Sequence, residues 1–311
     1  EICACLVGSE MCIRDSIMEM EITMKKCALH SLGCKVNSYE TQAMQKMMES
    51  AGYEIVPFGE EIADIYIINT CSVTNIADRK SRQMIHKAKK LNPEAVVAAA
   101  GCYVESAGDN IDEDVDIVIG NNEKSHLIEI LNEYFEHMDK EKSVDIGKAT
   151  DFDELNIDSP LEHTRAYVKI QDGCNRFCSY CIIPYVRGRI RSRKPDDVMA
   201  EIKRVAASGC KEVVLTGIHL SSYGLDFKDS TVKLIDVIEA VNRIEGIERI
   251  RLGSLEPLIV TEEFVRRLAK CKKICPHFHL SLQSGCDETL KRMNRRYNVC
   301  LLYTSPSPRD M

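Results

Sequence analysis

The sequence predicts an α/β protein with two parallel sheets, and three observations support this. Short apolar runs alternate with amphipathic helical patterns from residue 24 to about residue 131. The same alternation resumes at residue 165, and a polar, acidic stretch without a clear period lies between the two. Such alternation is typical of parallel sheets that helices cover on both faces. We expect a doubly wound domain over residues 24–140, a linker over residues 141–164 and a second α/β domain over residues 165–298.

The elements of the first half are bounded by residues that interrupt regular structure. Gly52 ends the first predicted helix, and Asn92 with Pro93 stops the second, because glycine and proline end helices readily. In chain order, this half is predicted to contain strands at 27–31, 64–69, 95–100 and 115–119, with helices at 38–50 and 77–91.

The second half is predicted to contain four strand–helix units. The strands are expected at 166–170, 212–216, 248–252 and 277–282, and the helices at 196–208, 233–244, 262–270 and 287–293. A complete barrel of eight such units takes about 250 residues. The second domain is therefore predicted to be an incomplete (β/α) barrel.

The composition is that of an ordinary globular protein, with 44% hydrophobic and 29% charged residues. The net charge of −7 does not indicate nucleic-acid binding, which would need a local basic patch. No apolar run reaches the length of a membrane span, so no membrane contact is expected. Residues 1–23 and 299–311 do not continue the neighbouring patterns and resemble translated adaptor sequence, so both are predicted to be non-native tails.

Fifteen cysteines are many for a chain of 311 residues. No convincing signal peptide is present, because the apolar run from Ile2 to Val7 is short and follows an acidic residue. Disulfides belong mainly to oxidising compartments. The cysteine content therefore favours a reduced, metal-binding protein in the cytoplasm.

Three cysteines, Cys174, Cys178 and Cys181, have the spacing C-x3-C-x2-C shortly after the apolar run 166–170. Iron–sulfur clusters are held by cysteine thiolates, usually four. Three thiolates on one loop would leave one iron of a cubane cluster free to bind a small molecule with an amine and a carboxylate. A structural zinc site would need a fourth ligand nearby, and none of the next three residues can serve. The alternatives are a chance spacing and a partial zinc knuckle.

A second trio, Cys34, Cys71 and Cys102, is dispersed in the sequence, yet each member lies within three residues of the carboxyl end of a predicted strand. Ligands bind outside the carboxyl ends of the strands in open α/β sheets, so this trio could converge on a second cluster. Gly33 and Gly101 precede two of the thiols and would let the backbone approach a bulky group. The alternative is three buried structural cysteines.

Several motifs, in the right order, resemble those of the radical S-adenosylmethionine (radical SAM) methylthiotransferases over about residues 24–298. They are Ser31–Thr41, Asn69–Thr74, Gly101–Tyr103, the three-cysteine loop, Val186–Arg193, Leu215–Leu220, Ser254–Pro257 and His279–Gly285. Within the family, the residues after Cys34 and Cys71 are most similar to those of the enzymes that modify threonylcarbamoyladenosine in tRNA. The family's C-terminal half-barrel and small RNA-binding β-domain have no counterpart in these motifs, so the radical SAM barrel is expected to be truncated.

The resemblance implies a tRNA-modifying transferase that adds a methylthio group to C2 of N6-threonylcarbamoyladenosine, next to the anticodon, by radical chemistry. It implies two 4Fe-4S clusters, one on each cysteine trio, S-adenosyl-L-methionine as cofactor, and an electron donor such as flavodoxin or ferredoxin. The alternatives are a methylthiotransferase for isopentenyladenosine in tRNA or for a ribosomal protein, and a non-catalytic iron–sulfur protein that binds RNA.

Further site predictions concern residues near the cysteines. Active residues of such barrels lie at the carboxyl ends of strands, and the candidates for contact with the cofactor are Tyr180, Gly217, Glu256 and Gln283. A plain core aromatic would explain Tyr180 equally well, and a tight turn would explain Gly217. The densest basic run is expected to contact the anticodon loop or the cofactor, and it comprises Arg187, Arg189, Arg191 and Arg193.

Overall fold

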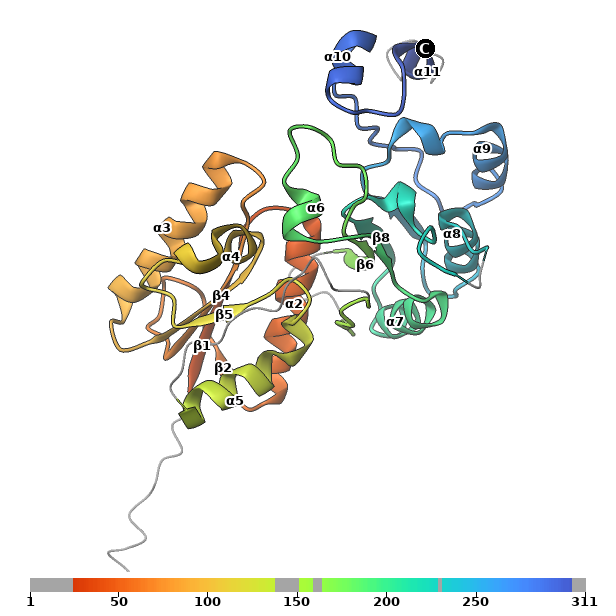
Figure 1. Ribbon diagram of the computed structural model, residues 1–311. Coiled ribbons are helices and arrows are strands. Elements are labelled where there is room, and N and C mark those ends of the chain that lie inside the picture. Colours follow the sequence, from red (N-terminus) through yellow and green to blue (C-terminus); the bar gives the residue numbers. More distant parts are fainter. Residues whose placement is uncertain (1–24, 138–150, 159–163, 229–230, 304–311) are drawn as a thin grey trace, which may run out of the picture.

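The computed structural model describes residues 25–137, 151–158, 164–228 and 231–303, which form two α/β halves (Figure 1). The predicted tail 1–23 lies outside the described residues, as do residues 304–311 of the predicted tail 299–311 and most of the predicted linker. Within the described ranges, no helix combines the length and the apolar character that a membrane crossing requires.

The first half is a doubly wound domain, as the sequence predicts. Its five parallel strands are β1 (Lys26–Ser31), β2 (Glu54–Ile55), β3 (Ile65–Thr70), β4 (Val96–Gly101) and β5 (Ile117–Ile119), in the order β2-β1-β3-β4-β5. Helices α2 (Lys35–Ser50) and α5 (Leu127–His137) pack on one face. Helices α3 (Asn75–Leu91) and α4 (Cys102–Ala107) pack on the other.

The second half contains a four-stranded sheet in the order β7-β6-β8-β9. Strands β6 (Ala166–Asp172), β8 (Glu212–Gly217) and β9 (Arg249–Leu252) are parallel, and the short β7 (Arg191–Ser192) pairs with β6 in the antiparallel sense. The hydrophobic core of this half is completed by helices α7 (Pro195–Ala207), α8 (Leu234–Asn242) and α9 (Glu262–Leu268). The remaining helices are α6 (Ile183–Val186), α10 (Asp287–Arg292) and α11 (Val299–Tyr303).

The predicted strand at 277–282 is wrong. Leu280 forms only an isolated parallel bridge with Leu255, while Phe278 and Leu282 are 43% and 60% exposed. Without a packed apolar face, this run does not form a continuous ladder with β9. The sequence analysis also missed helices α4, α5 and α11, the last of which lies in the predicted tail 299–311. It missed β2, α6 and β7 as well, which have two to four residues each and are too short to show a period.

Helix α2 belongs to the cores of both halves and stands between their sheets (Figure 1). Met44 and Met48 pack against the first sheet, whereas Tyr39 and Ala43 pack in the core of the second half. Leu155, which falls in the predicted linker, is also buried in that second core, and its carbonyl accepts a hydrogen bond from the Tyr39 hydroxyl. The two halves therefore share buried apolar surface.

Candidate functional site

The dispersed cysteine trio converges at one edge of the first sheet. Cys34 is the N-cap of α2 just after β1, Cys71 follows β3 directly, and Cys102 opens α4 after β4. Strands β1, β3 and β4 are neighbours in the sheet, and the strand order reverses at β1 and β3. Ligands of doubly wound sheets bind at such a switch point, so the fold brings the three thiols to a binding position.

In this trio, glycine is required directly before two of the cysteines, Cys34 and Cys102. Gly33 has φ +102°, and a Cβ there would lie 2.8 Å from both Cβ and Sγ of Cys71. Gly101 has φ +99°, and a Cβ there would lie 2.6 Å from the carbonyl oxygen of Thr70. A side chain at either position would be strained and would displace a neighbour. Both glycines thus allow close packing within the chain, and the approach of the backbone to a bulky bound group stays a prediction.

Polar side chains of the first half form hydrogen bonds with Cys71 and Cys102. Ser81, on α3, accepts a hydrogen bond from the Cys71 N–H (3.0 Å) and donates one to its carbonyl (2.9 Å). The Asn121 amide donates to Cys102 Sγ at 3.9 Å. Burial raises the pKa of Cys71, and the neighbouring thiols Cys102 and Cys34 raise it further. Metal binding would displace the proton from such a thiol.

The second trio lies on the loop between β6 and α6. Cys174 and Cys178 are buried and Cys181 is partly buried. The Arg176 N–H donates to Cys174 Sγ at 3.4 Å, and the Cys181 N–H donates to the Cys178 carbonyl at 2.9 Å. Burial raises the pKa of Cys174 to about 11 and also raises the pKa of Cys181. The loop thus carries all three thiols between β6 and α6.

Both trios suit clusters better than single ions. All cysteines in the described residues are free thiols. A set of at least three His, Cys, Asp or Glu residues could hold a metal ion where their ligand atoms all lie within 4.8 Å of one another. In the described part of the chain, the one such set is His86, Asp112 and Asp114. Neither cysteine trio meets this distance criterion. Thiolates are the usual ligands of iron–sulfur clusters, so free thiols are suitable residues for holding such clusters.

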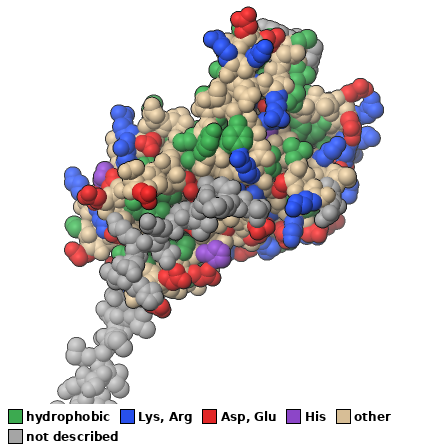
Figure 2. All heavy atoms as spheres, viewed as in Figure 1, with side chains coloured by type: hydrophobic (Ala, Val, Ile, Leu, Met, Phe, Trp, Pro, Cys, Tyr) green, Lys and Arg blue, Asp and Glu red, His purple; other side chains and the backbone are tan. Residues whose placement is uncertain are grey.

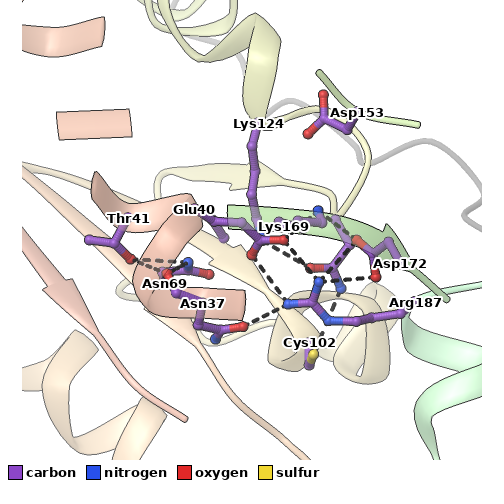
Figure 3. A network of polar contacts seen from close by, with 12 residues as sticks. Asn37, Glu40, Thr41, Asn69, Cys102, Lys124, Asp153, Lys169, Asp172 and Arg187 are labelled. Atoms are coloured by element: carbon purple, nitrogen blue, oxygen red, sulfur yellow. Dashed lines mark hydrogen bonds and ion pairs between the residues drawn. The ribbon is translucent and has the colours of Figure 1, made fainter. Parts of the chain in front are cut away.

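A buried network of charges joins the two halves beneath Cys102 (Figure 3). We call it the Glu40 network, and its members, all at most 1% exposed at the side chain, are Glu40, Lys124, Lys169, Asp172 and Arg187. Glu40 on α2 pairs with Lys124 of the first half, with Lys169 on β6 (2.8 Å) and with Arg187 (2.9 Å). Asp172 pairs with Lys169 (2.7 Å) and Arg187 (3.1 Å).

Opposite charges keep Glu40 and Arg187 ionised despite their burial, whereas burial lowers the pKa of Lys124. Burial alone would raise the pKa of Glu40, but Arg187, Lys124 and Lys169 hold it well below its usual range. Burial would lower the pKa of Arg187, and the carboxylates of Glu40 and Asp172 instead raise it well above its usual range.

The five residues of the Glu40 network contain one more cation than carboxylates, and buried Arg191, whose Nη2 lies 3.8 Å from Oδ2 of Asp172, adds a further positive charge. Arg187 Nε has no hydrogen-bond partner in the described residues, and the charge of Arg187 opposes the rise in the pKa of Cys71. A four-iron cluster on three thiolates is negatively charged. The surplus cation therefore fits a cluster at Cys34, Cys71 and Cys102.

The prediction that the arginine run contacts RNA is wrong for Arg187, Arg191 and Arg193, which are at most 1% exposed. They are held inside by carboxylates, because β7 pairs with β6 in the interior and Arg193 binds Glu154 and Glu201. Only Arg189 is exposed, with its guanidinium 4.4 Å from the centre of the Phe177 ring. Figure 2 shows acidic and basic side chains interspersed over the visible face rather than one basic patch.

The four residues predicted to contact the cofactor have different surroundings. Tyr180 is 54% exposed beside the loop cysteines, and Gln283 is also exposed. Gly217 is required by packing, since a Cβ there would lie 2.9 Å from Oε1 of Gln171. Glu256 is buried, as an active-site carboxylate can be. Contact of these residues with the cofactor stays a prediction.

A second group of charged residues surrounds Glu256. The sequence analysis identified Glu256 but missed the other members of this group. Its carboxylate lies 2.5 Å from Nη2 of Arg176, 3.2 Å from Nε2 of His219 and 3.5 Å from Nη2 of Arg295. Burial alone would raise the pKa of Glu256, but His219, Arg176 and Arg295 lower it. Arg295 also donates to Cys178 Sγ at 3.2 Å.

Some of the missed residues had a detectable signal in the sequence. Lys169 is a lone lysine inside an apolar strand, and Glu40 follows Asn37 by three residues on the helix after Cys34. A charge in such a position needs a buried partner. Arg295, in contrast, is 117 residues from Cys178 in the sequence, and no local pattern indicates that the two side chains meet.

Comparisons with known families agree with this two-part architecture. Residues 26–120 match a family described as "Uncharacterized protein family UPF0004", and residues 168–300 match the radical SAM superfamily. These two matches cover the first sheet with its cysteine trio and the second sheet with its cysteine loop, respectively.

Curated relatives extend across both halves. The threonylcarbamoyladenosine tRNA methylthiotransferase MtaB of Bacillus subtilis is 42% identical, over 89% of this chain and 61% of that protein. The protein of the same name from Aquifex aeolicus is 43% identical, over 88% and 66%. The tRNA-2-methylthio-N(6)-dimethylallyladenosine synthase of Clostridium botulinum is 35% identical, over 89% and 62%. The chain thus spans less than two thirds of the length of these relatives.

Solved structures support the fold. The radical S-adenosylmethionine methyltransferase TsrM from Kitasatospora setae matches with a TM-score of 0.62 at 12% identity, over 90% of this chain and 64% of that one. The cobalamin-dependent S-adenosylmethionine radical enzyme OxsB matches with a TM-score of 0.60 at 11% identity, over 94% and 51%. At such low identity the likeness concerns the arrangement of the two sheets alone.

Proposed function

Because this chain belongs to the radical SAM methylthiotransferase family, we propose that it is a tRNA methylthiotransferase. The proposed reaction adds a methylthio group to C2 of N6-threonylcarbamoyladenosine next to the anticodon, with S-adenosyl-L-methionine as cofactor. The observation that carries the proposal is the presence of two free cysteine trios, one in each half, above a buried network of charges that joins the halves. Identities of 42% and 43% to two relatives named for this substrate support it.

Two 4Fe-4S clusters are proposed, one on Cys174, Cys178 and Cys181, and the other on Cys34, Cys71 and Cys102. The radical SAM family implies the first cluster and S-adenosylmethionine. The second cluster is supported by the shared sheet edge, the glycines that allow close approach, and the surplus cation Arg187. When bound, these groups supply the carbon radical and the sulfur that an unreactive aromatic C–H bond requires.

The residues of the chain orient the reactants and exclude water. Cys174, Cys178 and Cys181 would hold the first cluster with three thiolates, one fewer than clusters usually have, so the cofactor could bind to it. Glu256, with Arg176, His219 and Arg295, forms a buried charged group beside this loop. The exposed Tyr180 and Arg189 lie on the outer side, where a nucleotide could stack or leave its phosphate. Tyr180, Gly217, Glu256 and Gln283 remain the proposed contacts to the cofactor.

The proposed partners are the anticodon loop of tRNA and an electron donor such as flavodoxin or ferredoxin. A base in a loop is already nearly outside the stack, so an enzyme reaches its C2 edge at low cost. We place the protein in the cytoplasm, where free thiols stay reduced.

A second candidate substrate is tRNA that carries dimethylallyladenosine, since a relative named for that product is 35% identical. Liquid chromatography and mass spectrometry of nucleosides separates the two. The proposed substrate requires methylthio-threonylcarbamoyladenosine after incubation of tRNA with the reconstituted enzyme. Methylthio-dimethylallyladenosine alone would favour the second candidate.

The first prediction tests the two clusters. Anaerobic reconstitution should give about eight irons per chain, and replacing Cys174, Cys178 and Cys181 with Ala should leave about four. The same replacement should abolish formation of 5′-deoxyadenosine from S-adenosylmethionine after dithionite is added. Iron analysis and chromatography are the measurements. Loss of all iron, or of none, would contradict separate sites, and bound zinc without cofactor cleavage would favour a non-catalytic protein.

A further inference from the structure

The segment 293–297 contacts the loop that carries Cys174, Cys178 and Cys181, although about 117 residues separate the two in the sequence. We call this loop the radical-cluster loop. The Ser179 N–H donates to the Met293 carbonyl at 3.2 Å. The Asn294 amide donates to the carbonyls of Arg176 (3.3 Å) and Phe177 (2.9 Å). Asn294 and Phe177 both have positive φ, +58° and +48°, a conformation that needs support from its surroundings.

Arg295 brings a charge from this segment to the cluster loop. Its Nη1 donates to Cys178 Sγ at 3.2 Å, and its Nη2 lies 3.5 Å from Oε1 of Glu256. Its guanidinium lies 5.0 Å from the centre of the Tyr297 ring, and its side chain is 8% exposed. These contacts fix the guanidinium against the thiol with little access to water.

The need to neutralise the Glu256 carboxylate does not explain why the Arg295 guanidinium lies at this site. The Glu256 carboxylate already lies 2.5 Å from Arg176, a shorter contact than its 3.5 Å to Arg295. Arg176 and Arg295 together carry one more charge than Glu256 supplies. The Nε atoms of both arginines are buried without a hydrogen-bond partner in the described residues. The site therefore has a surplus positive charge and free N–H donors, which could bind a negatively charged group on the loop.

We propose that Arg295 is a positioning residue of the radical cluster, which holds the Cys178 thiolate and raises the reduction potential of the cluster. Hydrogen bonds to the sulfurs and nearby charge set the potentials of iron–sulfur clusters. A cation that donates to a thiolate stabilises the reduced cluster, which carries one more negative charge. The proposal rests on the cluster at Cys174, Cys178 and Cys181 that the proposed function requires.

The test measures the potential of this cluster alone. In the chain with Cys34, Cys71 and Cys102 replaced by Ala, a redox titration followed by electron paramagnetic resonance gives the midpoint potential without tRNA or turnover. Arg295→Met should lower the equilibrium constant for one-electron reduction about tenfold, a shift of about 59 mV to lower potential. Arg295→Lys keeps the positive charge but loses the planar guanidinium. Its midpoint potential should therefore lie between those of the parent and of Arg295→Met. The matched control is Arg296→Met, which removes the same charge from the exposed neighbour and should leave the potential unchanged.

Iron content and unfolding of the metal-free protein complete the test. Loss of iron in Arg295→Met, with unfolding like that of Arg296→Met, would support the holding role. Equal potentials in Arg295→Met and Arg296→Met would overturn the proposal, as would iron loss that merely follows a loss of stability of the metal-free chain. A parent variant that binds no four-iron cluster would instead contradict the proposed function.

Discussion

Single backbone positions decide how closely the sulfurs of the first trio approach one another. Gly33 precedes Cys34 and lies directly against the side chain of Cys71. Two different constraints act at this residue, the positive φ and the lack of space for a Cβ. The two can be separated by experiment, because Gly52 has a similar φ of +89° but nothing within 4 Å of the position of a Cβ.

We predict that Gly33→Ala disrupts the second cluster. The new Cβ would lie 2.8 Å from Cys71 Sγ, so the thiol must move, and iron after reconstitution should fall from about eight to about four per chain. Gly52→Ala should cost a similar backbone strain of about 1–3 kcal/mol and keep both clusters. Iron analysis and chemical denaturation measure the two effects. Full iron content in Gly33→Ala would contradict the role of this close contact.

At this scale the sequence predicts the cysteines but not the arginines. The spacing of Cys174, Cys178 and Cys181 is local, and the other trio follows from the ends of strands. The run of alternating arginines shows only that they share a side, and whether that side faces water depends on carboxylates far away in the sequence, such as Glu40 and Glu201. An interior site for Arg187 therefore could not be read from its neighbours.

At the scale of elements, the parallel strands were predictable because their apolar runs are buried on both faces. All six residues of β3 are buried, for instance. The two-residue edge strands β2 and β7 and the irregular run 277–282 were not predictable. The run 277–282 is apolar enough for a strand, yet it forms only one bridge, from Leu280 to Leu255, which lies three residues beyond the end of β9. An apolar pattern does not reveal whether a neighbouring strand is available for pairing.

Helix α4 carries a partly buried carboxyl group, Glu105, three residues after Cys102. Glu105 accepts a hydrogen bond from the Asn121 N–H at 2.7 Å, and Asn121 in turn contacts Cys102. Burial raises the pKa of Glu105 to about 7, whereas an unfolded chain has about 4.3. Folding therefore favours the protonated form, so this contribution to stability is complete below about pH 4.3 and is lost as the pH rises to about 7.

We predict that Glu105→Gln removes this pH dependence. Glutamine keeps the side-chain oxygen that accepts from Asn121 but does not titrate. Each unit of pKa difference corresponds to about 1.4 kcal/mol, so the variant should gain a few kcal/mol relative to the parent between pH 5 and pH 8. Denaturant unfolding of the metal-free protein at several pH values measures it. An unchanged difference between parent and variant across this range would show that Glu105 does not titrate there.

At the scale of the whole molecule, helix α2 and the Glu40 network make the two halves one unit. Met44 and Met48 of α2 lie in the core of the first half, and Tyr39 lies in that of the second. Glu40 bonds Lys124 from the first half, and Lys169 and Arg187 from the second. Since both cysteine trios border this junction, their relative placement depends on it.

We therefore predict that Glu40→Gln destabilises both halves together. Three buried cations would share the single carboxylate of Asp172, and breaking a buried ion pair by removing one partner typically costs about 3–5 kcal/mol. The control is Glu49→Gln, which removes an exposed carboxylate from the same helix and should change stability by less than about 0.5 kcal/mol. Denaturant unfolding should show one transition in the parent chain. In Glu40→Gln it should shift as a whole, because α2 cannot leave one core without exposing the other. A variant in which only one half unfolds early, or one no less stable than Glu49→Gln, would contradict coupling through Glu40.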